Sequence, residues 1–393
     1  MAVRKVAKKA KKTTKKVAKS VAKKTTKKAA PKVAKKVAKK AKKKAASSAA
    51  KKTAKKAIKK RVIKAAKKVA SKSSKKTTKK LAKKPSTFTK AKTIKVGSAH
   101  FDKELFDSLL ELIRTTSAEL PDDIQKVILE ALAREEKNTT AEYAMQIIKA
   151  NIELAKKKSQ PLCQDTGTIL FFVDHPVGFS QRHFTKICES AVLKATEVGY
   201  LRQNSVNSLT GKNDCMNVGG GHPDIHFHEH DKDTVEIRLM LKGGGCENVG
   251  AQYSLPNTAL EAGRDLDGVR KVILDAIVKA QGKGCGPGVL GICIGADRGR
   301  GYVHSKEQLL RRLDDTNEIE ELAAMEADIV ETANRLGIGP MGFGGKTTLL
   351  GCKIGALNRL PASYFVSISY MCWAYRRKGV SLSKSGKISK WIY

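Results

Sequence analysis

The chain has 393 residues, and its formal net charge is +41 at pH 7. Of its 78 Lys and Arg residues, 41 fall in residues 1–97, where no acidic residue occurs, so 78 − 41 = 37 basic residues face 37 acidic residues in the remainder. The excess charge therefore belongs to the N-terminal segment alone. No apolar run is long enough for a transmembrane helix, and the Lys- and Ala-rich start lacks the apolar stretch of a signal peptide, so we expect no membrane partner.

The eight cysteines are scattered through the chain without a C-x-x-C pair. A disulfide framework is typical of small secreted domains, so reduced thiols or metal ligands are the better interpretation here. We therefore expect a cytoplasmic protein.

Residues 1–97 repeat a small vocabulary of Lys, Ala, Thr, Val and Ser, and the first aromatic residue is Phe88. Such a segment cannot bury enough apolar surface to offset its chain entropy, so it is predicted to be a disordered basic tail. Its composition resembles the tails of linker histones and the Lys/Ala-rich histone-like proteins of some bacteria. We expect non-specific binding to nucleic acid through the phosphates, with association with the nucleoid. A purely solubilising tail is the alternative.

Three helices are predicted after the tail. Residues 101–116 have apolar side chains at helical spacing, with Asp102 expected to cap the start. A second helix is predicted over 121–135, because its leading proline suits a first turn, and a third over 140–158. We expect them to form a helical subdomain whose apolar stripes are core.

Beyond this subdomain, short apolar runs alternate with glycine clusters. Strands are predicted at 168–173, 234–242 and 289–296, and helices at 266–281 and 317–336. Strands and helices in mixed order predict an α+β (mixed α/β) fold, with residues 98–393 as one domain. Its glycine-rich loops are places where backbone comes close to a ligand, so we expect a site assembled from loops.

Four motifs in this region contain cysteines, and the first three also contain glycines. They are QPLCQDTGT at 160–168, KGGGCENVGAQYSLP at 242–256, GKGCGPGVLGICIG at 282–295 and SYFVSISYMCWAYRR at 363–377. A lone cysteine in a loop is more often structural than a ligand. Cys163, Cys285 and Cys372 also lack the close spacing of zinc ribbons and ferredoxins, so spacing alone does not establish a metal site.

Taken together in this order, the four motifs resemble those of the class I fumarate hydratases and L-tartrate dehydratases, over residues 160–377. The resemblance implies a [4Fe–4S] cluster held by Cys163, Cys285 and Cys372, with one iron left open as a Lewis acid. It implies a hydro-lyase that acts on a small dicarboxylic 2-hydroxy acid. The leading interpretation is malate–fumarate interconversion, a step of the tricarboxylic acid cycle, and L-tartrate dehydration is the alternative.

The same resemblance implies roles for five further residues. Gln164 and Asp165 line the pocket as catalytic residues, with Asp165 meeting the substrate hydroxyl or a bound water. Arg202, in YLRQNSV, binds a substrate carboxylate, for which a planar guanidinium is suited, although a surface arginine is the simpler interpretation. Gly244 and Gly245 present backbone amides to a substrate carboxylate.

Several other features favour structural explanations. The other five cysteines are expected to be core thiols, with Cys246 the most ambiguous because the family commonly has a small polar residue there. The histidines of HFHEH at 226–230 suit a metal, but a solvated strand end is favoured. GFGGKTT at 342–348 lacks the first glycine of a P-loop. Asp297 and Arg298 are either pocket-lining or a structural ion pair.

Two departures from the family qualify these expectations. Full-length class I enzymes have a second domain that supplies the catalytic base, whereas this chain ends 393 − 372 = 21 residues after Cys372. We therefore expect a hetero-oligomer with a beta-type subunit. Leu360 stands where many members have a histidine, which puts the substrate in question. The rival hypothesis is a nucleic-acid-associated protein whose hydratase-like domain is inactive.

Overall fold

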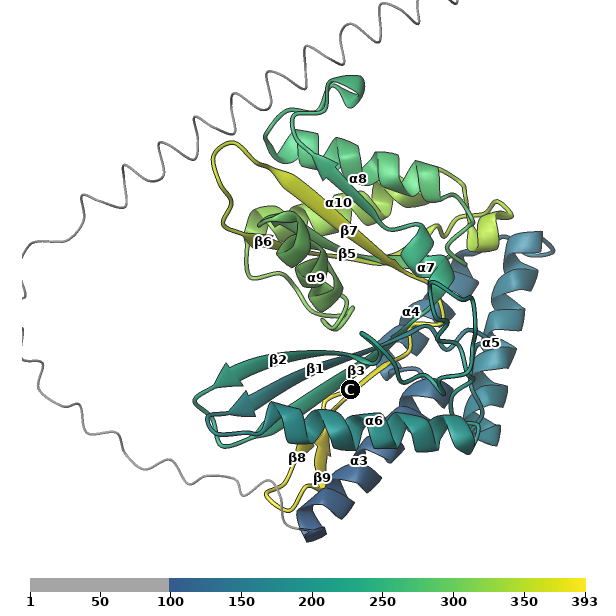
Figure 1. The fold of residues 1–393 in the computed structure, drawn as a ribbon. Coiled ribbons are helices and arrows are strands. Elements are labelled where there is room, and N and C mark those ends of the chain that lie inside the picture. The colour runs from purple at the N-terminus through teal and green to yellow at the C-terminus, as the bar shows by residue number, and fades with distance from the viewer. Residues whose placement is uncertain (1–98) are drawn as a thin grey trace, which may run out of the picture. The chain divides into compact units, whose positions relative to one another are not determined.

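The computed structural model describes residues 99–393, so the predicted disordered tail lies outside the described residues. The described part has the predicted mixed α/β fold, with two separate mixed sheets and helices against both (Figure 1). In this part of the chain, no helix is both long enough and apolar enough to cross a membrane.

The helices agree closely with those predicted, and others lie between them. Their bounds are α3 (Ala99–Ala118), α4 (Asp122–Arg134), α5 (Thr140–Lys158), α6 (Gln181–Glu197), α7 (Gly244–Asn248), α8 (Leu266–Ala280), α9 (Arg298–Gln308), α10 (Glu320–Arg335), and the 3-10 helices η1 (Thr258–Leu260) and η2 (Pro340–Gly342). One expectation is wrong: Asp102 does not cap the start of α3, because the helix begins at Ala99. Asp102 lies within its first turn, and its carboxylate is 2.8 Å from Nε2 of His183 on α6.

A five-stranded sheet has the order β2-β1-β3-β8-β9. Its strands are β1 (Thr168–Pro176), β2 (Asp224–His230), β3 (Val235–Lys242), β8 (Arg377–Leu382) and β9 (Ile388–Trp391). Only β1 and β2 are parallel to each other, and the other neighbours in this sheet are antiparallel. Both faces are covered, since Ile169, Phe171 and Val173 of β1 pack in one core while Leu170 and Phe172 pack in the other. This burial on two sides explains why β1 is a continuous apolar run.

The second sheet has four strands in the order β4-β7-β5-β6. They are β4 (Ala251–Ser254), β7 (Phe365–Met371), β5 (Gly288–Gly295) and β6 (Leu349–Leu357), and only β5 and β6 are parallel. Helices α8 and α10 lie against one face and α9 against the other (Figure 1). Gly291 of β5 lets α9 approach closely, because a Cβ there would lie 2.2 Å from the carbonyl oxygen of Ser305.

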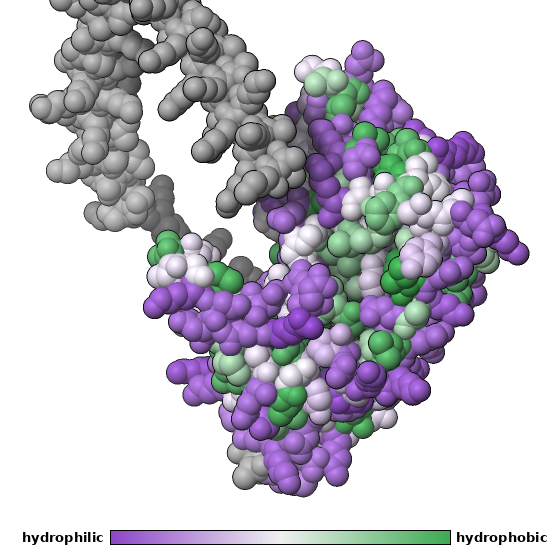
Figure 2. Space-filling view, turned by 90° about the vertical axis from the view of Figure 1, so that its right-hand side faces the viewer, coloured by the Kyte–Doolittle hydropathy of each residue, from purple (hydrophilic) through white to green (hydrophobic). Residues whose placement is uncertain are grey.

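The first three helices of the described residues divide between the two cores. Leu105, Leu109 and Leu112 of α3 pack with α6 on the five-stranded sheet. Helices α4 and α5 contribute to the core that includes β5, β6 and β7. On the surface shown in Figure 2, hydrophobic side chains are interspersed with hydrophilic ones.

The chain passes between the two sheets in adjacent segments. One segment leaves β3, forms α7 and enters β4, and the other leaves β7 and reaches β8 through residues 372–376. The amide of Leu241 donates to the carbonyl of Arg376 (2.9 Å), and the amide of Cys372 donates to Sγ of Cys246 (3.3 Å). The glycine motif of 242–256 and the cysteine motif of 363–377 therefore meet where the sheets join.

Candidate active site

The Asp165 carboxylate connects three separate loops. Its Oδ1 accepts hydrogen bonds from the Gly167 amide (2.8 Å) and from Nδ2 of Asn204 (2.7 Å), and its Oδ2 accepts from the Gly244 amide (2.6 Å). An ionised carboxylate is an acceptor with about four lone-pair sites, so these donors hold it in place and leave room for one more. The side chain remains partly exposed.

Glycines are needed where the Asp165 loop meets the glycine triplet. Gly167 has a φ of +76°, and a Cβ there would lie 2.3 Å from the carbonyl oxygen of Lys242. A Cβ on Gly243 would lie 3.1 Å from Oδ2 of Asp165. Because a side chain at either position would push the loops apart, the CQDTG and KGGG motifs form one docked unit.

The other residues expected in the pocket lie around this unit. Thr166 holds the backbone of Arg202 through hydrogen bonds to its amide (2.9 Å) and carbonyl (2.8 Å). The side chains of Arg202 and Gln164 are exposed, so both are accessible to a ligand. The amide of Gly244 already donates to Asp165, which leaves Gly245 as the glycine whose amide is not used by that carboxylate.

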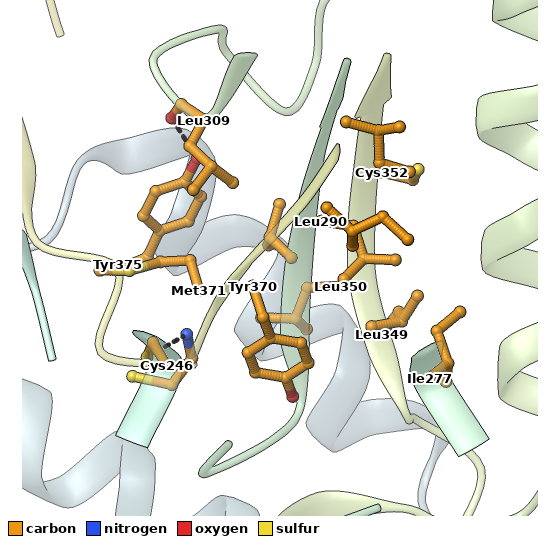
Figure 3. Packing of buried hydrophobic residues seen from close by; sticks show 14 of the residues in the cluster. Cys246, Ile277, Leu290, Leu309, Leu349, Leu350, Cys352, Tyr370, Met371 and Tyr375 are labelled. Carbon is orange, nitrogen blue, oxygen red and sulfur yellow. Dashed lines mark hydrogen bonds between the residues drawn. The ribbon is translucent and has the colours of Figure 1, made fainter. Parts of the chain in front are cut away.

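The Cys285 loop wraps around the ring of Tyr370. Cβ atoms on Gly284 and Gly288 would lie 2.5 Å and 2.2 Å from that ring, so only glycine allows this path. Cys285 itself has a φ of +56°, a left-handed conformation that is uncommon for a non-glycine residue and often found at functional sites. Figure 3 shows the Tyr370 ring at the same end of the buried core as Cys246.

Four thiols gather at this end of the sheets. Burial raises the pKa of Cys285, and the negative charges of Cys246, Cys163 and Asp165 act in the same direction. The hydrogen bond between the Cys246 and Cys372 thiols raises the pKa of Cys372, as does its burial, and lowers that of Cys246. The three cysteines of the sequence prediction thus lie in one neighbourhood, and Cys246 joins them.

Cationic side chains stand beside the thiols. The fully buried Lys242 lies 3.2 Å from Glu247, and Lys306 of α9 lies 2.8 Å from the same carboxylate. Two cations therefore share one anion, and the positive charge of Lys242 also favours the Cys246 thiolate.

The donor set fits an iron–sulfur cluster in chemical type, because thiolates are the usual ligands of such clusters. Within residues 99–393, no three His, Cys, Asp or Glu side chains are grouped closely enough to hold a single metal ion. A cluster of several irons spaces its ligands more widely than one ion does. Thiols that share a neighbourhood without converging on one point are consistent with that wider spacing.

The family model described as "Fumarate hydratase (Fumerase)" matches residues 106–381, which is more than half of the chain. This chain belongs to the fumarate hydratase family.

Similar proteins include one of Geobacillus stearothermophilus named as a class I fumarate hydratase, which is 50% identical over 296 residues, 74% of this chain and 57% of that relative. A Methanocaldococcus jannaschii protein named as an L(+)-tartrate dehydratase alpha subunit is 35% identical over 280 residues, 70% of this chain and 96% of that relative. The L(+)-tartrate dehydratase alpha subunit of Escherichia coli strain K12 is 30% identical over 264 residues, 66% of this chain and 85% of that relative. The chain therefore spans little more than half of the first relative's length.

Other residues singled out in this fumarate hydratase family member lie apart from the thiols. Asp297 caps α9 by accepting from the amides of Gly299 and Arg300, and Arg298 bonds to Gln252 and Ser254, so the two do not form an ion pair with each other. Leu360 is 73% exposed in the loop that enters β7, at the opposite end of that strand from Cys372.

The histidines at 226–230 lie on β2, an edge strand of the five-stranded sheet. They are less solvated than expected: His226 stacks on Phe172 and lies 3.1 Å from Asp224, and His228 lies 3.3 Å from Asp174.

Among the cysteines expected in the core, Cys188, Cys293 and Cys352 are buried as predicted. Cys215 is not a core thiol, because it lies partly exposed in a loop, where its Sγ is 3.6 Å from the carbonyl of Ser205. Sequence reasoning also missed Asn204, Tyr370 and Arg376. Their positions in YLRQNSV and SYMCWAYRR, within four residues of predicted site residues, are the only signal in the sequence.

Proposed function

We propose that residues 98–393 form the cluster-binding half of a hydro-lyase active site that interconverts malate and fumarate. The observation that carries the proposal is the docking of the CQDTG loop on the KGGG loop, with an anchored and partly exposed carboxylate among thiols. Membership of the fumarate hydratase family and the 50% identity with a class I relative support the same activity.

Cys163, Cys285 and Cys372 are the proposed ligands of a [4Fe–4S] cluster. When bound, such a cluster with three cysteine ligands supplies an open iron that acts as a Lewis acid toward the substrate hydroxyl. Cys246 is not assigned as a ligand, because its Sγ already accepts the Cys372 amide and its thiolate is favoured by Lys242.

The remaining roles belong to residues around the thiols. Asp165 is held by three donors and has acceptor capacity left, so it is suited to receive a hydrogen bond from the substrate hydroxyl. The exposed Arg202 guanidinium is suited to bind a carboxylate in a bidentate manner. The Gly245 amide is the proposed second contact to a substrate carboxylate, with Gln164 lining the pocket.

A beta-type subunit is proposed to complete the site. The alpha-subunit names of two relatives support this. L-Tartrate is the alternative substrate, because the same two relatives are named as L(+)-tartrate dehydratase subunits. A cytoplasmic location is proposed because all eight cysteines are free thiols.

The test is anaerobic turnover. The full chain is reconstituted with iron and sulfide, combined with a candidate beta chain, and supplied with malate or L-tartrate while fumarate or oxaloacetate is followed. We expect turnover on malate, and Asp165→Asn should reduce kcat by roughly 10- to 100-fold, because hydrogen bonds to a charged acceptor contribute about 1.5–3 kcal/mol.

The matched control is Asp297→Asn, which alters another loop carboxylate that anchors backbone amides but lies at the start of α9. This variant should keep its activity within a few-fold of the native chain. A reconstituted pair without turnover on either acid, or equal losses in both variants, contradicts the proposed function.

A further inference from the structure

Arg376 is a buried cation for which residues 99–393 supply no ion-pair partner. Its side chain is 1% exposed, and within residues 99–393 its Nε and Nη1 nitrogens have no hydrogen-bond partner. It lies in the segment that leaves Cys372 and crosses toward β8, with its carbonyl bonded to the Leu241 amide next to the glycine triplet. The guanidinium is therefore enclosed in the part of the fold that holds the thiols.

The next residue shows what a compensated arginine looks like in this fold. Arg377 is also fully buried, and its Nε and Nη1 likewise lack a hydrogen-bond partner within residues 99–393. Its Nη2, however, donates to Asp123 (2.6 Å) and to the carbonyl of Arg311 (3.1 Å). Its guanidinium also stacks on the rings of Tyr375 and Tyr393. The comparison matters because a buried charge is costly unless it is paired.

The charges near Arg376 do not compensate it within this chain. The segment that carries it is bonded to two of the thiol residues, since the Cys372 amide donates to Sγ of Cys246 (3.3 Å) and the Trp373 amide donates to the carbonyl of Cys285 (3.5 Å). The nearby carboxylate of Glu247 is already shared by Lys242 and Lys306. The thiol neighbourhood therefore has more cations than anions while its cysteines are protonated.

We propose that Arg376 is the buried counter-cation of the thiolate-bound iron–sulfur cluster. Thiolates outnumber the positive charges of such a cluster, so the assembly is an anion and would satisfy a guanidinium that the chain leaves unpaired. This inference rests on the proposed function, because it requires the cluster. Arg376 acts through the cluster and its thiolates, so it is a positioning residue for the cluster rather than a group that touches the substrate.

The test compares Arg376→Met, Arg376→Lys and the neighbouring control Arg377→Lys in the full-length chain, reconstituted anaerobically. Arg376→Met should weaken cluster retention against an iron chelator by roughly 10-fold or more, the range for loss of an outer-shell partner. It should also shift the midpoint potential to a more negative value, because a nearby positive charge favours the reduced cluster. Arg376→Lys should recover most of both properties, and Arg377→Lys should leave the potential unchanged.

The unfolding of the cluster-free proteins separates this role from a structural one. Without the cluster, Arg376→Met should be at least as stable as the native chain in urea, since it removes an unpaired buried charge. A native chain that binds no cluster contradicts the proposed function and this inference with it. A native chain that binds the cluster while Arg376→Met matches it in retention and potential overturns the inference alone, and so does a cluster-free Arg376→Met that is less stable than the native chain.

Discussion

Gly167 and Gly199 have similar positive φ angles in different surroundings. Their φ angles are +76° and +81°, but a Cβ on Gly167 would lie 2.3 Å from the Lys242 carbonyl, whereas one on Gly199 would meet nothing within 4 Å. Gly199→Ala should therefore lower the free energy of unfolding by only about 1 kcal/mol, the cost of a left-handed conformation for alanine. Gly167→Ala should lower the free energy of unfolding by about 3 kcal/mol or more, because two stretches of backbone must separate.

Urea unfolding of the native chain and both variants measures this difference. Gly199→Ala is the control for backbone conformation, and the excess loss in Gly167→Ala reports the docking of the two motifs. Equal losses in the two variants would mean that the CQDTG loop does not depend on close contact with the KGGG loop.

At the scale of residues, the sequence identifies the members of the proposed site more readily than the residues that support them. Cys163, Asp165 and Cys285 stand in recognisable motifs, and the structure brings them together. Asn204 and Arg376 escape prediction because their roles depend on which loops meet in space. A buried arginine and a surface arginine look the same in a sequence, so the contrast between Arg376 and Arg377 is visible only from their partners.

At the scale of elements, a carboxylate on α9 connects the two sheets. Oε1 of Glu307 lies 2.8 Å from Arg300 of its own helix and 3.7 Å from His228 of β2, and its Oε2 lies 2.6 Å from His304. Burial acts to raise the pKa of Glu307, but the hydrogen bond from His304 and the charge of Arg300 outweigh it, so the pKa lies below its usual value of 4.5.

Because its pKa is lower in the folded state, the Glu307 carboxylate stabilises the fold at pH values above its unfolded pKa. This contribution is lost as the pH falls below about 4.5 and through the folded pKa. Glu307→Gln should lower the free energy of unfolding by about 1 kcal/mol at pH 7, the range for partly exposed ion pairs.

The measurement is urea unfolding of the native chain and Glu307→Gln between pH 3 and pH 7. The difference between them should shrink as the pH falls. Glu331→Gln is the control, because Glu331 pairs with Arg335 on the exposed surface of α10 and should contribute little at any pH. A difference that grows toward acidic pH would contradict the lowered pKa of Glu307.

Helices and strands are predicted correctly where the spacing of apolar residues follows a single period. The predicted bounds of α5 match the structure, because its apolar stripe is regular and Thr139 caps it by accepting from the Glu142 amide. The sequence identifies β2 only as a candidate strand with metal-type histidines, because the alternation of Ile225 and Phe227 with polar residues is short and its pairing comes from β1, about 50 residues earlier. Such pairing depends on the whole fold rather than on local sequence.

At the scale of the whole molecule, the thiol site depends on the joining of the sheets. Motifs from 160–168, 242–256, 282–295 and 363–377 meet only because the chain crosses between the sheets in neighbouring segments. This arrangement gives one carboxylate, several thiols and a surplus of cations in one neighbourhood. The sequence identifies the motifs that carry these residues. That the motifs meet follows from the order of the strands in the sheets, which no local sequence pattern encodes.

The charge of the chain sets a separate prediction for residues 1–97. These residues hold 41 basic and no acidic side chains, whereas the remainder has no net charge, so any attraction to polyanions should come from this segment alone. We expect the full chain to bind duplex DNA without sequence preference and with an affinity that falls steeply as salt rises, through release of counterions.

Deleting residues 1–97 should abolish this binding and leave cluster reconstitution unchanged. Titrations of labelled DNA at several salt concentrations, with the full chain and the shortened chain, measure both the affinity and its salt dependence. A matched variant that replaces only the lysines of residues 1–44 should keep part of the affinity and show a smaller salt slope, because the slope scales with the number of phosphates neutralised. Binding by the shortened chain would place the nucleic-acid contact on residues 98–393, where no net positive charge explains it.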